Sequence, residues 1–65
     1  MKELFQTFDY KRHGVEVVLH DCLYYSYTIH HNGTKTDSKM YFFQPHMATR
    51  AARTQIDETL RAKES

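Results

Sequence analysis

LYYSYTIHHNGTKTDSKMYFF, residues 23–43 of the chain, holds two runs of strand-forming residues on either side of an Asn-Gly pair. Tyr, Thr, Ile and Phe fit a pleated, half-buried surface. Asn32-Gly33 favours a two-residue type I′ turn, because the twist of that turn matches the twist of the strands it joins. The stretch therefore predicts a β-hairpin with strands at 23–31 and 35–43.

The turn also predicts which side chains share a face of the hairpin. Cross-strand pairs expected on one face are Ile29 with Thr36, Tyr27 with Ser38, Tyr25 with Met40, and Leu23 with Phe42. Pairs expected on the opposite face are His30 with Lys35, Thr28 with Asp37, Ser26 with Lys39, and Tyr24 with Tyr41. A slip of one residue would mix the two sets, so the clean sorting supports this register.

Two further strands are expected before the hairpin. Residues 3–10 are rich in aromatic side chains, and residues 15–20 alternate in the manner of a half-buried strand. Between them, residues 11–14 form a turn signal, with Gly14 available for a positive φ if the turn needs one. Asp21-Cys22 predicts a second tight turn, which leads into the hairpin.

The C-terminal third predicts a helix over residues 45–62. Pro45 suits the first helical turn, where its missing N–H is not needed. One apolar stripe follows at spacings of three and four: Ala48, Ala51, Ala52, Ile56 and Leu60. The fold class is thus α+β, an antiparallel meander of three to four strands covered on one face by a single helix, in one domain spanning residues 1–65.

Composition narrows the possible functions. The 65 residues carry a net charge of +1, with nine Lys and Arg against eight Asp and Glu. Dedicated nucleic-acid domains are usually more basic. No apolar run is long enough for a membrane span. Cys22 is the only cysteine, which fits a reducing compartment. We therefore expect a cytoplasmic protein that does not bind membranes.

No enzymatic signature is present, so we expect no catalytic residues, no cofactor and no small-molecule substrate. His20, Cys22 and His46 are expected near the same end of the sheet. They match no recognised zinc spacing, and we predict no metal site. The simpler interpretation is that His20 and His46 are solvated and that Cys22 is a small, half-buried thiol.

The face of the sheet that the helix leaves open is the most informative surface. It is expected to group the aromatic side chains of Tyr24, Tyr41 and Phe43, and to continue along the strands into a polar and basic strip. The candidate partner-binding residues are Tyr24, Tyr41, Phe43, Lys39, His30 and Lys35. Exposed contiguous aromatics on a small domain usually mark an interface.

Three occupants of that face remain open. The chain's own N-terminal segment could cover it through Leu4, Phe5 and Phe8. A second copy or a different protein could dock there, which would make the chain a small accessory or regulatory protein acting by protein–protein contact. Nucleic acid could stack on the aromatics while the lysines hold phosphates.

A second candidate surface lies at one edge of the sheet. Alternating strand directions place the turn at residues 11–13 and the turn at residues 32–35 together, and the end of the helix returns to the same edge. Lys11, Arg12 and Arg61 are possible contacts for an anion or phosphate there. The acidic residues Asp37, Asp57, Glu58 and Glu64 are expected close enough to weaken the field of these cations.

In outline, the hairpin from Tyr24 through Asn32-Gly33, the run 40–43 and the helix with Ala51-Ala52 resemble the sheet-reading DNA-binding domains of plant AP2 factors and some phage-type integrases. The resemblance covers about two thirds of the chain and rests on generic hairpin and helix features. Those families place several Arg and Trp residues on the reading sheet, whereas this face offers only lysines. The resemblance implies DNA binding as the alternative function.

Overall fold

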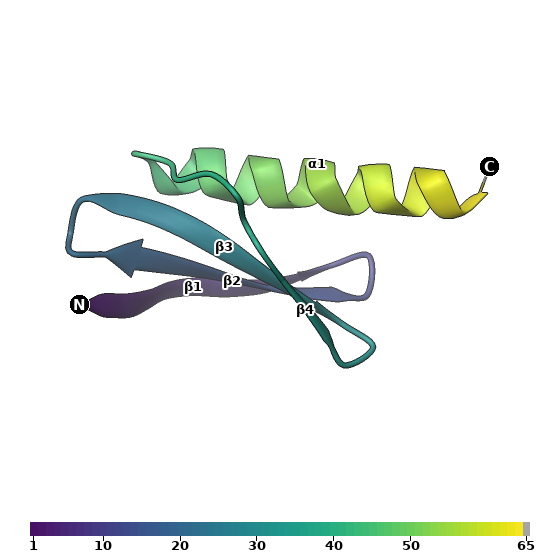
Figure 1. Ribbon diagram of the computed structural model, residues 1–65, viewed down its shortest axis with the longest axis horizontal. Coiled ribbons are helices and arrows are strands. Elements are labelled where there is room, and N and C mark those ends of the chain that lie inside the picture. Colours follow the sequence, from purple (N-terminus) through teal and green to yellow (C-terminus); the bar gives the residue numbers. More distant parts are fainter. Residues whose placement is uncertain (65) are drawn as a thin grey trace.

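The computed structural model describes residues 1–64, and its N-terminal part is a four-stranded antiparallel sheet (Figure 1). The strands are β1 (Lys2–Tyr10), β2 (His13–His20), β3 (Tyr24–His31) and β4 (Thr34–Asp37), and each pairs with its neighbour in sequence. Helix α1 (Pro45–Glu64) lies across one face of this sheet. The predicted β-β-β-β-α meander is confirmed.

All three turns of the meander use left-handed backbone. Asn32 and Gly33 have φ values of 50° and 77°, which confirms the type I′ turn. Lys11 and Arg12 repeat this geometry between β1 and β2, with φ values of 50° and 68°. Gly14 does not provide a positive φ there, because it lies within β2 opposite Asp9. The tight turn after β2 is confirmed, with φ positive at residues 21 and 22.

The predicted hairpin register holds next to the turn and fails beyond it. Ile29 pairs with Thr36, and the neighbouring pairs also match the prediction. The strand predicted to reach residue 43 ends at Asp37. The next residue, Ser38, bonds through its side chain at the bend that follows. Its hydroxyl accepts from the Tyr27 amide at 3.2 Å and donates to the Met40 carbonyl at 3.0 Å.

This bend inserts two residues, so the strand pairing predicted beyond Tyr27 and Ser38 is wrong, although the rings of one predicted pair, Tyr24 and Tyr41, remain in contact. Tyr25 bridges Phe42 instead of Met40. Because the shift is even, Phe42 keeps its predicted face and packs against the core. Met40, predicted to be under the helix, is 66 % exposed, and Leu23 lies in the β2–β3 turn rather than opposite Phe42.

The core lies between α1 and the two central strands. Its buried residues are Val15, Val17, Tyr27, Ile29, Ala48, Ala52 and Ile56. The two alanines are fully buried, and their small side chains let the helix lie close to β2 and β3. The predicted apolar stripe of the helix therefore packs against the strands that were predicted to face it. Within residues 1–64, no helix has the length and apolar character that crossing a membrane requires.

The N-terminal segment forms a strand beside β2 and does not cover the open face of the sheet. Phe8 packs at the margin of the core, and the Phe5 ring meets the Tyr25 ring on the helix side, with centroids 5.2 Å apart. The alternative in which Leu4, Phe5 and Phe8 cover the open face is therefore wrong. That face is left uncovered by the described chain.

Candidate functional site

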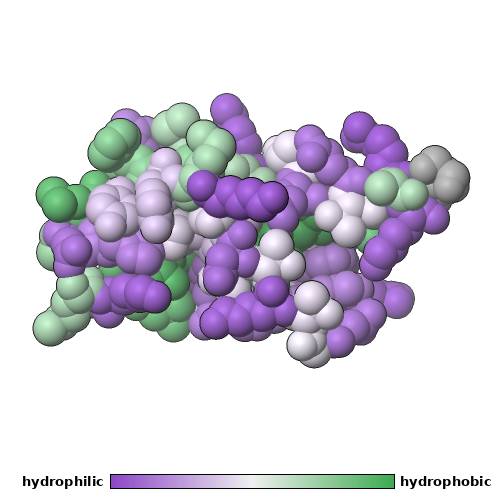
Figure 2. All heavy atoms as spheres, viewed as in Figure 1, coloured by the Kyte–Doolittle hydropathy of each residue, from purple (hydrophilic) through white to green (hydrophobic). Residues whose placement is uncertain are grey.

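Large apolar side chains that remain exposed gather at one end of the molecule, the left end in Figure 2. The antiparallel topology brings the β2–β3 turn, the segment 38–44 and the start of α1 to this end (Figure 1). Its exposed members from these segments are Leu23, Tyr41, Phe43 and Met47, and Met40 extends the patch along segment 38–44 towards the middle of α1. Together with Tyr24 we call these residues the apolar end. The N-terminal residues Met1, Leu4 and Phe5 are also exposed.

An aromatic cluster links the apolar end to the open sheet face. The rings of Tyr24 and Tyr41 meet edge to face with centroids 4.6 Å apart, which confirms that this predicted pair is in contact. His20 stacks on Tyr24 at 5.1 Å and is held by Ser26, whose hydroxyl lies 2.7 Å from His20 Nε2. Edge-to-face geometry is favoured by the ring quadrupoles, so the rings of the cluster stabilise one another's positions.

The other predicted partner-binding residues are divided between two surfaces. Phe43 is 83 % exposed at the apolar end. His30 and Lys35 pair across β3 and β4 on the open face, as predicted. Lys39 does not join them, because the bend after Asp37 places it beside α1, in a hollow that Met40 and Glu58 also line. The structure therefore separates Lys39 from the strip it was expected to extend.

The open sheet face carries charges of both signs. His30 bonds through Nε2 to the Glu16 carboxylate, and the Thr28 hydroxyl donates to Asp37 at 2.8 Å. Lys35 lines the same shallow surface as these two acidic residues. Acidic groups placed between the cations weaken the field that a phosphate backbone would meet. This face is polar without being a basic stripe.

The predicted basic edge exists, and part of its charge is already paired. Figure 1 shows the β1–β2 turn, the β3–β4 turn and the end of α1 at the same end of the molecule. Lys11 Nζ lies 2.6 Å from Asp57 Oδ1, and the Tyr10 hydroxyl donates to the same carboxylate at 3.0 Å. The Lys11 contact lowers the pKa of Asp57, with Arg61 adding a smaller effect, and Asp57 in turn raises the pKa of Lys11.

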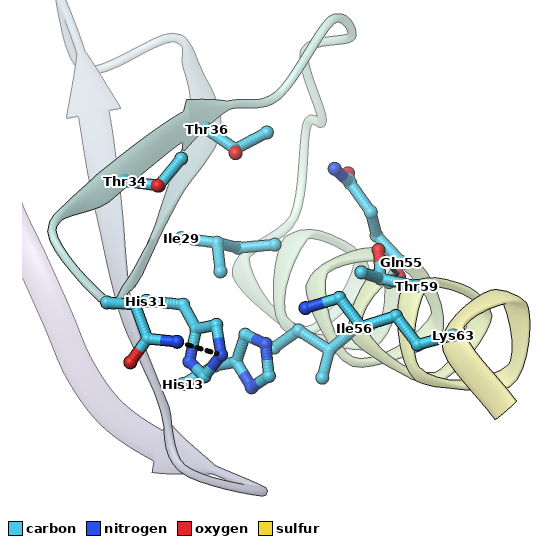
Figure 3. Close-up of a pocket in the computed structure, with 10 residues that line it drawn as sticks. His13, Ile29, His31, Thr34, Thr36, Gln55, Ile56, Thr59 and Lys63 are labelled. Carbon is cyan, nitrogen blue, oxygen red and sulfur yellow. Dashed lines mark hydrogen bonds between the residues drawn. The ribbon is translucent and has the colours of Figure 1, made fainter.

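A hollow lies between the β3–β4 hairpin and the second half of α1 (Figure 3). His13 and His31 stack on its floor with ring centroids 3.9 Å apart, and Thr59 and Lys63 reach it from the helix. Its volume is about 230 Å³. Sites for drug-sized ligands are usually larger, about 300–1,000 Å³. The hollow is therefore a weaker candidate than the apolar end.

The buried His13 was missed by sequence reasoning. It is 4 % exposed, and its Nδ1–H donates to the Lys11 carbonyl at 2.9 Å. His31 Nδ1 lies 3.4 Å from the Arg12 carbonyl, so the two rings tie down both residues of the β1–β2 turn. Extending the alternation of Val15 and Val17 back by two residues would have placed His13 on the inward face.

His20 and His46 lie on opposite faces of the sheet. His20 belongs to the open face, while His46 lines a hollow between β1 and α1, and Cys22 is exposed in the β2–β3 turn. Among residues 1–64, no three His, Cys, Asp or Glu side chains are grouped so that they could hold a metal ion.

Comparison of the chain with protein-family models, with curated proteins and with solved structures finds no match.

Proposed function

We propose that this protein is a small, non-enzymatic accessory protein that acts by binding another protein through its apolar end. The observation that carries the proposal is the collection of exposed Leu, Met, Tyr and Phe side chains at one end of a molecule whose other end is polar (Figure 2). Contiguous exposed apolar surface usually marks an interaction site.

The chemistry of the apolar end suits a partner with an apolar contact surface. Met40 and Met47 supply flexible, polarisable side chains, which are frequent at adaptable binding surfaces. Tyr24 and Tyr41 supply rigid aromatic area fixed by mutual contact. A few aromatic anchors surrounded by adaptable contacts is the usual anatomy of an interface hot spot.

The exposed, unpaired thiol of Cys22 supports the cytoplasm as the compartment in which the protein works. Nucleic acid is the alternative occupant, taken from the outline resemblance to sheet-reading DNA-binding domains. The mixed charge of the open face supports it less well than the apolar end supports a protein.

The test compares a double variant, Met40→Ser with Phe43→Ser, against the wild type and against Lys35→Ser as a control on the open face. All three positions are exposed, so the melting temperature should stay close to wild type. Partners captured from native lysate are identified, and each is then purified and titrated directly against the three proteins.

The proposal predicts a purified protein partner that binds wild type and Lys35→Ser alike and loses at least about tenfold in affinity with the double variant. Partners that bind the double variant as tightly as wild type would contradict it. Binding to DNA or RNA that weakens steeply with salt would replace it with the nucleic-acid alternative.

A further inference from the structure

β1 is a long sheet edge that the described chain leaves open. It spans nine residues and pairs only with β2, whereas β4 at the other edge spans four residues. Helix α1 packs mainly over β2 and β3 and reaches only the inner face of β1, where the Tyr10 hydroxyl bonds to Asp57. An open edge presents unpaired N–H and C=O groups and is a template for another strand.

A β-bulge divides the edge strand into two matching halves. Leu4 pairs with Val18 and Gln6 with Val17, so Phe5 is the extra residue. The bulge sorts the side chains into two sets. On the open face lie Lys2, Leu4, Thr7 and Asp9, and on the helix face lie Glu3, Phe5, Gln6, Phe8 and Tyr10. Along residues 2–9 the side chains point to the open face and the helix face in an order that is the same when it is followed from either end of the segment.

The free backbone groups follow the same symmetry. In antiparallel pairs, alternate residues direct their N–H and C=O groups to the same neighbour. The two-residue turn closes on the bonded pair Tyr10–His13, so Thr7 and Asp9 direct theirs to the open edge. On the other side of the bulge, Glu3 pairs with Leu19, and Leu19 is one of the alternate β2 residues whose backbone groups bond to β1. Its neighbours Lys2 and Leu4 therefore also direct their N–H and C=O groups to the open edge.

We propose that β1 is a homodimer interface, in which β1 pairs antiparallel with β1 of a second copy about a two-fold axis between Phe5 and Gln6. Lys2 then lies opposite the partner's Asp9 and Leu4 opposite the partner's Thr7. In each pair both side chains lie on the open face, and both residues have free backbone groups that can bond to each other. The two-fold axis creates the Lys2–Asp9 charge pair twice. No other register matches the faces along the whole strand, because the bulge sits at its centre.

The dimer also covers apolar surface on the helix side. Phe5 is 48 % exposed and lines a hollow of about 430 Å³ with Pro45 and His46. Across the two-fold axis, Phe5 lies beside the partner's Gln6, and the hollows of both copies meet. The two four-stranded sheets join into one sheet that carries both helices on the same face. This interface does not use the apolar end, so it stands independently of the proposed function.

The register is tested with reversed charges. Lys2 and Asp9 are seven residues apart on one strand, about 23 Å, so they cannot pair within a chain. Lys2→Asp and Asp9→Lys each place like charges opposite each other twice and should weaken the dimer about tenfold. The double variant restores both pairs and should recover wild-type affinity. Dimerisation is measured by analytical ultracentrifugation, with Lys39→Asp as a charge control, because Lys39 lies beside α1 in a hollow that no β1 residue lines.

A second variant tests the edge itself. Thr7→Pro removes an N–H that points to the open edge, so the monomer fold should survive, as far-UV circular dichroism can verify, while the dimer is lost. A wild-type protein that is monomeric at micromolar concentration, or a dimer unaffected by Thr7→Pro, would overturn the interface. A charge-reversed double variant as weak as the single variants would overturn the register. Met40→Ser with Phe43→Ser should leave the dimer intact.

Discussion

Replacing Arg12 with glycine should stabilise this protein, because Arg12 occupies a left-handed backbone conformation at φ 68°. That conformation costs a residue with a Cβ about 1–2 kcal/mol. Glycine gives back about 0.5–1 kcal/mol through its greater freedom in the unfolded chain. The net gain is therefore about 0.5–1 kcal/mol, which corresponds to a rise of about 2–8 °C in melting temperature for a domain of this size.

The geometry of the turn should survive this substitution. His13 and His31 bond to the carbonyl oxygens of Lys11 and Arg12, and neither bond uses the Arg12 side chain. The substitution thus removes strain without removing a contact that holds the turn. Thermal unfolding followed by circular dichroism gives the melting temperatures of wild type and variant under identical conditions.

The reciprocal variant is Gly33→Ala in the β3–β4 turn. Gly33 has φ 77°, and a Cβ added there would have no neighbour within 4 Å, so any loss arises from the backbone alone. A loss of about 1 kcal/mol is expected. If Arg12→Gly lowers the melting temperature while Gly33→Ala also lowers it, the two turns are not equivalent, and the reasoning from φ is refuted.

Three further outcomes follow from buried or paired groups. Ile56→Ala should cost about 2–5 kcal/mol, most of what a core of this size supplies, and leave the chain largely unfolded in a urea titration, whereas Ile56→Val should stay folded. Burial, reinforced by Glu58, raises the pKa of Tyr27, so the stability it contributes is present below the ordinary tyrosine pKa and is lost as pH rises through the raised value. An alkaline absorbance titration should show a late phase that Tyr27→Phe removes, and an unchanged curve would contradict this. The pKa of Asp57 is lowered by the Lys11 contact, so its contribution is present above the ordinary carboxyl pKa and is lost as pH falls. Asp57→Asn should flatten the acid side of the stability profile, and a profile that keeps its slope would count against the pair.

The parts of the fold that were predictable from sequence depend on local signals. Asn32-Gly33 fixes the turn and the register of the residues beside it, because few other residues tolerate two positive φ values in succession. Pro45 and the alanine stripe fix the helix and its buried face. The contact between Tyr24 and Tyr41, which carries part of the candidate site, was also predicted, although the bend at Ser38 changes the strand register there.

The parts that were not predictable depend on tertiary contacts. The residue types Lys11 and Arg12 do not indicate a left-handed backbone. The turn is instead stabilised by hydrogen bonds from two histidine rings, one in β2 and one in β3, to its carbonyl oxygens. β4 ends early at a bend where the Ser38 hydroxyl bonds to the Tyr27 amide and the Met40 carbonyl, and beyond this bend Lys39 and Met40 do not occupy the positions expected for them. Phe43 consequently reaches the apolar end rather than the aromatic cluster.

The order of the strands has a consequence for how the chain folds. Each strand pairs with the one before it, so every step of sheet formation closes a turn of only two or three residues. Closing short loops loses little chain entropy, and proteins rich in local contacts reach the native state faster than those that join distant segments. The hairpins can form while the chain is being synthesised, and the helix, which follows the sheet in sequence, completes the core. Folding of this chain should therefore be fast and limited by the docking of α1, which places the kinetic barrier at Ala48, Ala52 and Ile56 rather than in the sheet.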